Sequence, residues 1–412
     1  MSDCIFTFGK KDKKLLIPLI YLIVYILINI FETEPNIVDT YIENFAMSIS
    51  EIMGFFISVI VKHFFKIKLT QKTEKQKYLK DFGILFLITG FYKFNDILPF
   101  ALDKLKNAKN NEDEKDIDNS REILINDALE LIVISLVTYL TLKYKYYIHH
   151  IISIIIIDLI CVALDFAFFN FFHTNIYTII SSFVLIFADS FLYSYLKYLI
   201  EFKYYFYLDL LYIYGIFCFF WNTLSLGTII LVHKIKGSDS IIFEFYDYFR
   251  DKGSLMIIIR FLKGLIISGF IIDILEFLIL DKLTPNYIII GFEIGKIPSN
   301  IMYFVTTKDY NNFGNLKVLI LIAIIVLSIL QVLGFLFYLE ILEFNFCSLN
   351  ENTKKNIEER GRLLAFNNIF FDNNEADKES DIAIKDYIIT DGFRKKDTGI
   401  SFEGRQTISS IN

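Results

Sequence analysis

Residues 15–31 read LLIPLIYLIVYILINIF, and residues 318–339 read VLILIAIIVLSILQVLGFLFYL. As a helix, each run is long enough to cross a hydrocarbon core about 30 Å thick. Similar blocks of roughly 17 to 28 residues recur along the 412-residue chain, in which 54% of residues are hydrophobic and 21% are charged. This pattern excludes a set of soluble domains and predicts an all-α, polytopic transmembrane helix bundle.

Ten apolar blocks are candidate membrane spans, with boundaries soft by several residues. They cover about 15–31, 45–65, 82–100, 123–142, 147–167, 176–199, 205–233, 255–280, 285–306 and 317–344. A basic segment precedes the first block and resembles the start of a signal peptide. However, that block ends at Phe31-Glu32 without a small-residue cleavage site. We therefore expect an uncleaved anchor.

The short loops predict how the bundle is oriented. The loop 66–80 carries six lysines, whereas the loops 32–44 and 168–175 carry no Lys or Arg. Basic short loops stay on the cytosolic side of a membrane. Because the number of spans is even, both termini are predicted to be cytosolic.

The ten spans divide into a first half, residues 1–172, and a second half, residues 173–344. Two echoes match these halves in the register of an inverted repeat. Gly90-Phe91 followed by Asn95-Asp96 matches Gly269-Phe270 followed by Asp273-Ile274, and the segment 59–63 (VIVKH) matches 230–234 (ILVHK). An odd number of spans in each half turns the second half over in the membrane. We therefore expect a five-plus-five inverted repeat.

The segment 345–412 is polar, charged and without an apolar helical repeat, which is typical of a disordered cytosolic tail. Within it, Glu359, Leu363 and Leu364 fit the acidic dileucine pattern that vesicle adaptors read in sorting signals. The alternative is a chance match, because the pattern is short.

Ionisable residues inside the spans predict a polar cavity, since such a group costs several kcal/mol unless it faces a partner or water. Glu293, Lys296 and Asn300 share one helical stripe of the ninth span, and Pro298 should interrupt that helix. The other candidate substrate-binding residues are Lys93, Asn95, Asp96, Lys263, Trp221 and Asn222, and the candidates for proton or ion coupling are Glu51, Asp189 and Asp273.

Several of these polar residues also have a purely structural interpretation. Lysines near span ends can extend to the lipid headgroups. Asp127 and Glu130 are interpreted as acids of the first helical turn, where the helix dipole favours them. The 25 Tyr and 44 Phe are interpreted as the compositional bias of an AT-rich genome, so no site is assigned to them.

Catalytic, metal and nucleic-acid signatures are absent from the sequence. Motifs of the Gly-x-Ser-x-Gly, P-loop and His-Glu-x-x-His types do not occur, and there is no basic stripe. Cys4, Cys161, Cys218 and Cys347 form no CxxC pair. The pair His149-His150 is interpreted as two residues at a cytosolic helix end. We expect no enzymatic activity, cofactor, metal or nucleic-acid partner.

The ten spans, the echoes and the orientation together resemble the drug/metabolite transporter superfamily, which includes nucleotide-sugar, triose-phosphate and drug-resistance-type carriers. The turn from Lys93 to Pro99 is similar to the point where that superfamily begins its substrate-lining region. The hairpin through Leu142 and Lys145 is also similar, and the segment 340–350 is similar to the end of protist members.

This resemblance implies a transporter that moves a small anionic metabolite across the lipid bilayer by alternating access. Lys93, Lys263 and Lys296 would then neutralise the solute. It also implies an endomembrane location, in the Golgi or in a vacuole or lysosome, rather than the plasma membrane. The alternative is a multi-span channel or receptor whose cytosolic tail is regulatory.

Overall fold

The computed structural model describes residues 6–8, 15–30, 37–65, 75–107, 124–144, 146–167, 176–235, 250, 253–298, 301–302 and 317–344. Its helices are α1 (Leu16–Ile30), α2 (Ile37–Phe65), α3 (Lys75–Asn107), α4 (Leu124–Leu142), α5 (Ile148–Ala167), α6 (Ile176–Glu201), α7 (Tyr207–Ile235), α9 (Gly253–Leu262), η4 (Lys263–Ile272), α10 (Asp273–Lys282), α11 (Asn286–Gly295) and α14 (Lys317–Tyr338). Because α9, η4 and α10 follow one another without a break, they form one rod, and these ranges contain ten helical rods.

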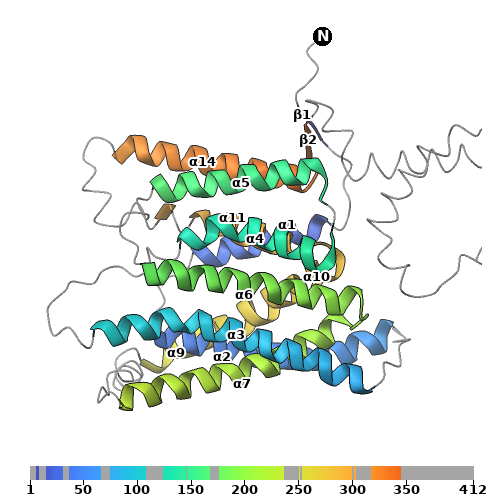
Figure 1. The fold of residues 1–412 in the computed structure, drawn as a ribbon, viewed down its shortest axis with the longest axis vertical. Coiled ribbons are helices and arrows are strands. Elements are labelled where there is room, and N and C mark those ends of the chain that lie inside the picture. The colour runs from blue at the N-terminus through green and yellow to red at the C-terminus, as the bar shows by residue number, and fades with distance from the viewer. Residues whose placement is uncertain are drawn as a thin grey trace, which may run out of the picture.

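The helices lie side by side with their axes roughly parallel or antiparallel (Figure 1). α5 packs on α14 at one edge, and α2 and α3 both pack on α7 at the opposite edge. Between these edges, α4 contacts α6 and α11, and α1 contacts α11 and α10. Large apolar side chains such as Phe56, Leu140, Leu159 and Leu319 are more than half exposed on the outside. An apolar surface of this extent fits a lipid environment.

The structure confirms the predicted all-α bundle, and its apolar helices are compatible with an integral membrane protein. Among the described residues, four helical segments are long and apolar enough to cross a bilayer: Tyr41–Phe64, Phe183–Glu201, Tyr207–Leu231 and Val318–Tyr338. Three shorter apolar helices, Leu16–Ile28, Leu129–Leu142 and Ile148–Leu164, add to them. The helix bounds follow the apolar blocks closely at 124–142 and 148–167.

The eighth apolar block differs from a regular helix. Its central part, η4, is a π-helix of ten residues between two α-helical segments. π-Helical turns are rare and are concentrated at functional sites. Gly264 and Gly269 let this rod approach α2 closely, since a Cβ at Gly269 would lie 2.6 Å from Ser50 Cβ and 3.0 Å from the backbone of Met47.

Two further departures from regular helix lie near the ends of the bundle. α11 ends at Gly295 with a turn at Lys296, in agreement with the interruption expected around Pro298. The block predicted as 317–344 is helical only to Tyr338. It continues into β2 (Leu342–Phe344), which pairs antiparallel with β1 (Phe6–Phe8). β1 and β2 therefore bring the described residues before α1 and after α14 together on one side of the bundle (Figure 1).

Candidate functional site

A cavity of about 410 Å³ lies inside the bundle and is lined by residues of α1, α2, α3, α4, α6, α7, η4, α10 and α11, and by Lys296 just after α11. Its ionisable lining residues are Glu43, Glu51, Lys93, Glu130, Asp189, Lys263, Asp273, Glu276 and Lys296. Sites between the helices of a bundle are common places for small ligands. The predicted residues Glu51, Lys93, Asp189, Lys263, Asp273 and Lys296 are therefore brought to one cavity.

Two carboxyl groups meet at one wall of this cavity. Glu51 of α2 and Asp273 of α10 are 3% and 7% exposed, and their carboxyl groups lie close enough to interact. Two carboxyl groups can share a hydrogen bond only if one of them carries a proton. The ammonium group of Lys93 on α3 interacts electrostatically with both carboxyl groups. The arrangement can hold a proton beside a buried cation.

Glu276, one helical turn after Asp273, is held by two tyrosines. The hydroxyl group of Tyr21 on α1 donates to Glu276 Oε1 at 2.9 Å, and that of Tyr193 on α6 donates to Oε2 at 3.1 Å. Hydrogen bonds to a charged group are stronger than neutral ones, and here they fix the orientation of the carboxylate. Sequence reasoning missed both tyrosines because it attributed the many tyrosines to composition.

The π-helix places a cation and a hydroxyl group against one acid of α2. Lys263 Nζ lies 3.2 Å from Glu43 Oε1, and the hydroxyl group of Ser268 donates to the same oxygen at 3.0 Å. Residues five apart do not share a face of an α-helix, whereas the i→i+5 bonding of a π-helix brings them together. The π-helix therefore supplies two contacts to Glu43 that a regular helix would separate.

The predicted stripe of the ninth span is only partly at the cavity. Lys296 lines the cavity, with its Nζ 3.6 Å from the centre of the Phe292 ring. Glu293 is 5% exposed and lies behind Lys296, with an Oε1–Nζ distance of 3.7 Å, as its counter-ion. The side chain of Asn300 lies outside the described residues.

Trp221 and Asn222, predicted to bind substrate, are placed elsewhere. In the part of the chain that the structure describes, neither residue lines the cavity. The Trp221 indole N–H donates to the backbone oxygen of Phe86 at 2.9 Å, and its ring covers Gly90 of α3. The Asn222 amide donates to Ser48 Oγ at 3.1 Å. Both residues join α7 to its neighbours.

The side chains of the remaining predicted site residues are not described. Asn95 and Asp96 fall within α3, but their side chains are not described. The sorting residues Glu359, Leu363 and Leu364 belong to the segment 345–412, which is also outside the described residues.

The charges of the lining residues do not balance. In the described part of the chain, six carboxyl groups and three lysines line the cavity, so their formal excess is three carboxylates. Lys263 and Lys296 are already engaged by Glu43 and Glu293. Among the described residues, Glu51 Oε2 and Asp273 Oδ2 are buried acceptors that no donor contacts. The cavity therefore favours a guest that brings positive charge and N–H donors.

No protein-family model matches the chain, and no curated protein matches it at a significant level. The resemblance to the drug/metabolite transporter superfamily remains a prediction.

Proposed function

We propose that the protein is a multi-pass membrane transporter that carries a small organic solute with a positively charged amino group. The observation that carries this proposal is the 410 Å³ cavity, whose lining combines six carboxyl groups with three lysines inside an apolar bundle. Buried charges at such a depth require a partner, water or a ligand. An amine solute supplies the cation that the lining lacks.

An anionic solute, as the superfamily resemblance implies, fits this lining less well. It would have to compete with Glu43 for Lys263 and with Glu293 for Lys296, and the excess of acids would repel it. A zwitterion such as an amino acid keeps both features, because its ammonium group can meet Glu51 and Asp273 while its carboxylate meets Lys93.

Proton coupling follows from the carboxyl pair. Without a solute, a proton held between Glu51 and Asp273 reduces the repulsion between the two carboxylates. An ammonium group that approaches the pair reduces this repulsion in place of the proton. Release of that proton lets the pair hold the cation as two carboxylates. The solute and the proton then compete for the same carboxyl pair, so that binding of one releases the other, which is the basis of exchange.

The pattern of helix contacts supports the five-plus-five repeat that alternating access requires. α1 to α5 can be matched in order with α6, α7, the α9–η4–α10 rod, α11 and α14. The contact of α4 with α6 then matches that of α11 with α1, and α3 with α7 matches the rod with α2. The pairs α2–α7, α5–α14 and α4–α11 each join two matched helices, so exchanging the two halves leaves these contacts unchanged. The contacts of α10 with α6 and α7 fall outside this matching.

Two glycine contacts support the same matching at the level of single residues. The first sequence match aligns Gly90 with Gly269. The second match aligns 59–63 with 230–234, and continuing that alignment toward the N-terminus without gaps aligns Ser50 with Trp221. In space, Trp221 covers Gly90, and Ser50 lies against Gly269. The aligned glycines thus receive aligned residues from the partner helix, as expected for two halves, 1–172 and 173–344, of one repeat with both termini on the cytosolic side.

Purified protein in proteoliposomes provides the test. We expect saturable uptake of an amine or an amino acid that is accelerated by an opposing proton gradient, and no uptake of a dicarboxylate or a sugar phosphate. Glu276→Gln should abolish this uptake, whereas the matched change Asp281→Asn, at the exposed end of α10, should not. Uptake of anions alone would overturn the charge assignment, and uptake that never saturates would favour a channel.

A further inference from the structure

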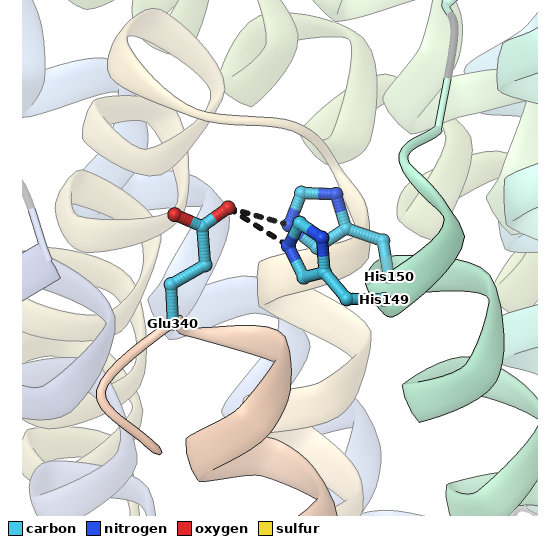
Figure 2. A group of neighbouring side chains, drawn as sticks. All are labelled: His149, His150 and Glu340. Atoms are coloured by element: carbon cyan, nitrogen blue, oxygen red, sulfur yellow. Dashed lines mark ion pairs between the residues drawn. The ribbon is translucent and has the colours of Figure 1, made fainter. Parts of the chain in front are cut away.

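A second cluster of polar side chains lies away from the cavity, at one end of the α5–α14 pair. His149 and His150 belong to the first turn of α5, and Glu340 follows the last turn of α14 (Figure 2). Both imidazole rings point toward the Glu340 carboxylate. His149 Nε2 lies 2.8 Å from Glu340 Oε1, and His150 Nε2 lies 3.7 Å from the same oxygen.

The three side chains offer the donor set and the spacing of a metal site. One ligand atom from each residue can be chosen so that all three lie within 4.8 Å of one another. In a tetrahedral zinc site with bonds of about 2.0–2.2 Å, ligand atoms are roughly 3.3 Å apart. Small rotations of side chains that already converge would therefore close the site around one ion.

The backbone at Glu340 shows that the carboxylate is placed there at a conformational cost. Glu340 has a φ of 54°, in the left-handed region that favours glycine. Its N–H donates to the Phe337 oxygen at 3.0 Å, and the Ile341 N–H donates to the Leu336 oxygen at 3.0 Å. This pair of bonds is the Schellman ending of α14, in which the left-handed residue is usually glycine. A glutamate in this position directs its carboxylate to the histidines.

Aromatic neighbours hold the two rings in place. The Tyr147 ring lies parallel to His149, with an interplanar angle of 12°, and the Tyr338 ring lies 4.8 Å from His150. His149, His150 and Glu340 are 7%, 13% and 18% exposed. Metal sites that bind tightly have ligands oriented by surrounding groups, and a partly exposed carboxylate leaves room for a water ligand.

We propose that His149, His150 and Glu340 bind a divalent transition-metal ion of the zinc class. Two imidazole nitrogens and one carboxylate oxygen suit zinc, cobalt or nickel and do not suit magnesium, which prefers oxygen ligands. The ion fastens the beginning of α5 to the end of α14, beside the β1–β2 pair that joins the two ends of the described chain. The site is separate from the cavity, so this proposal does not depend on the transported solute.

The sequence did not predict this site. Two adjacent histidines without further ligand spacing were interpreted as residues of a helix end, and no metal was expected. Glu340 comes from the far end of the chain, and no local motif links it to His149. Only the packing of α14 against α5 brings the three side chains together.

The test uses the purified full chain in detergent, stripped with EDTA and titrated with zinc, cobalt or magnesium. We expect one equivalent of zinc to bind, a higher unfolding temperature with zinc, a cobalt absorption spectrum typical of mixed nitrogen and oxygen ligands, and no response to magnesium. His149→Gln and His150→Gln should each weaken zinc binding at least about tenfold. The control His63→Gln, at an exposed histidine of α2, should bind zinc like the wild type.

Glu340→Gly separates metal binding from folding. Because glycine suits the left-handed position, the metal-free variant should unfold at the same temperature as the wild type or higher, and it should lose the zinc-dependent rise. Glu340→His should bind zinc, since it restores a ligand. If Glu340→Gly binds zinc like the wild type, or if the wild type binds no zinc-class ion, the proposal is overturned. A lower unfolding temperature of metal-free Glu340→Gly would assign the cluster to a structural ion pair and would also overturn it.

Discussion

α3 and the α9–η4–α10 rod both pack against α6 and α7, yet they reach the cavity in different ways. α3 is a regular α-helix, and among its described side chains only Lys93 brings a charged group to the lining. The rod supplies Lys263, Asp273 and Glu276, together with the hydroxyl group of Ser268. The π-helical segment is the structural difference, because it turns residues five apart toward one side.

The two elements also differ in how their glycines are covered. Gly90 of α3 lies under the indole ring of Trp221, a side chain that can move. Gly269 of the rod lies against the backbone of Met47 and the Cβ of Ser50, which cannot move without shifting α2. The contact of the rod with α2 should therefore be the less tolerant of the two.

The largest effect is expected for Gly269→Ala. The added methyl group would lie 2.6 Å from Ser50 Cβ, so α2 and the rod must separate, and the free energy of unfolding should fall by about 3 kcal/mol. Thermal unfolding in detergent measures this loss. Gly83→Ala and Gly227→Ala are matched controls, because nothing lies within 4 Å of their added Cβ. Equal unfolding temperatures for Gly269→Ala and these controls would contradict the close contact.

The next effect concerns the charges that the two elements bring to the cavity. Glu276→Gln keeps the shape of the side chain but removes the charge that Tyr21 and Tyr193 orient. The affinity for an amine solute should fall about 10- to 100-fold, since a hydrogen bond to a charged group contributes about 1.5–3 kcal/mol. Lys93→Met on α3 should instead leave amine affinity unchanged or raise it. Calorimetric titration with the transported amine decides this, and a larger loss in Lys93→Met than in Glu276→Gln would reverse the assignment.

A smaller effect is expected for Gly90→Ala, because the Trp221 ring can give way. The free energy of unfolding should fall by about 1–2 kcal/mol. In the Trp221→Leu background the same substitution should cost almost nothing, so the double-mutant cycle should show coupling. Gly269→Ala should show no such rescue by Ser50→Gly, since the Met47 backbone remains in contact. Additive effects of Gly90→Ala and Trp221→Leu would show that the ring does not press on this glycine.

Apolar length was enough to predict the bundle, because a helix in lipid must be long and apolar whatever it packs against. It could not predict where a helix changes type. The block 255–280 reads as one span, yet η4 lies within it, and the block 317–344 loses its helix after Tyr338. Both changes depend on tertiary contacts, with α2 in the first case and with α5 and β1 in the second.

The charged residues within apolar blocks could be predicted to line a cavity, because burying a charge away from water is costly. Lys93, Lys263 and Lys296 were selected because each lies in an apolar block, and each lines the cavity. Glu43 was missed because the block was thought to begin at residue 45, whereas α2 begins at Ile37. Glu130 was interpreted as an acid of the first helical turn.

The sequence could not predict which hydrogen-bond donors pair with which acceptors. Glu276 was seen within an apolar block but was not assigned to a site, and its partners Tyr21 and Tyr193 come from α1 and α6. Trp221 and Asn222 were assigned to the solute because polar groups are rare in spans. The structure uses them instead to hold α7 against α3 and α2.

The smallest effect is expected for two tyrosines of α6, one of which contacts α3 and the other the α9–η4–α10 rod. The Tyr193 hydroxyl group donates to the Glu276 carboxylate of the rod, and that of Tyr195 donates to the Asp81 backbone oxygen of α3 at 3.1 Å. Tyr193→Phe removes one of two donors to the cavity acid, so amine affinity should fall about fivefold, equivalent to about 1 kcal/mol. Tyr195→Phe should lower the free energy of unfolding by about 1 kcal/mol and leave amine affinity unchanged. The same titration and unfolding experiments measure both variants. If Tyr195→Phe weakens binding as much as Tyr193→Phe does, α3 and the rod contribute alike to the site, and the contrast between the two elements is wrong.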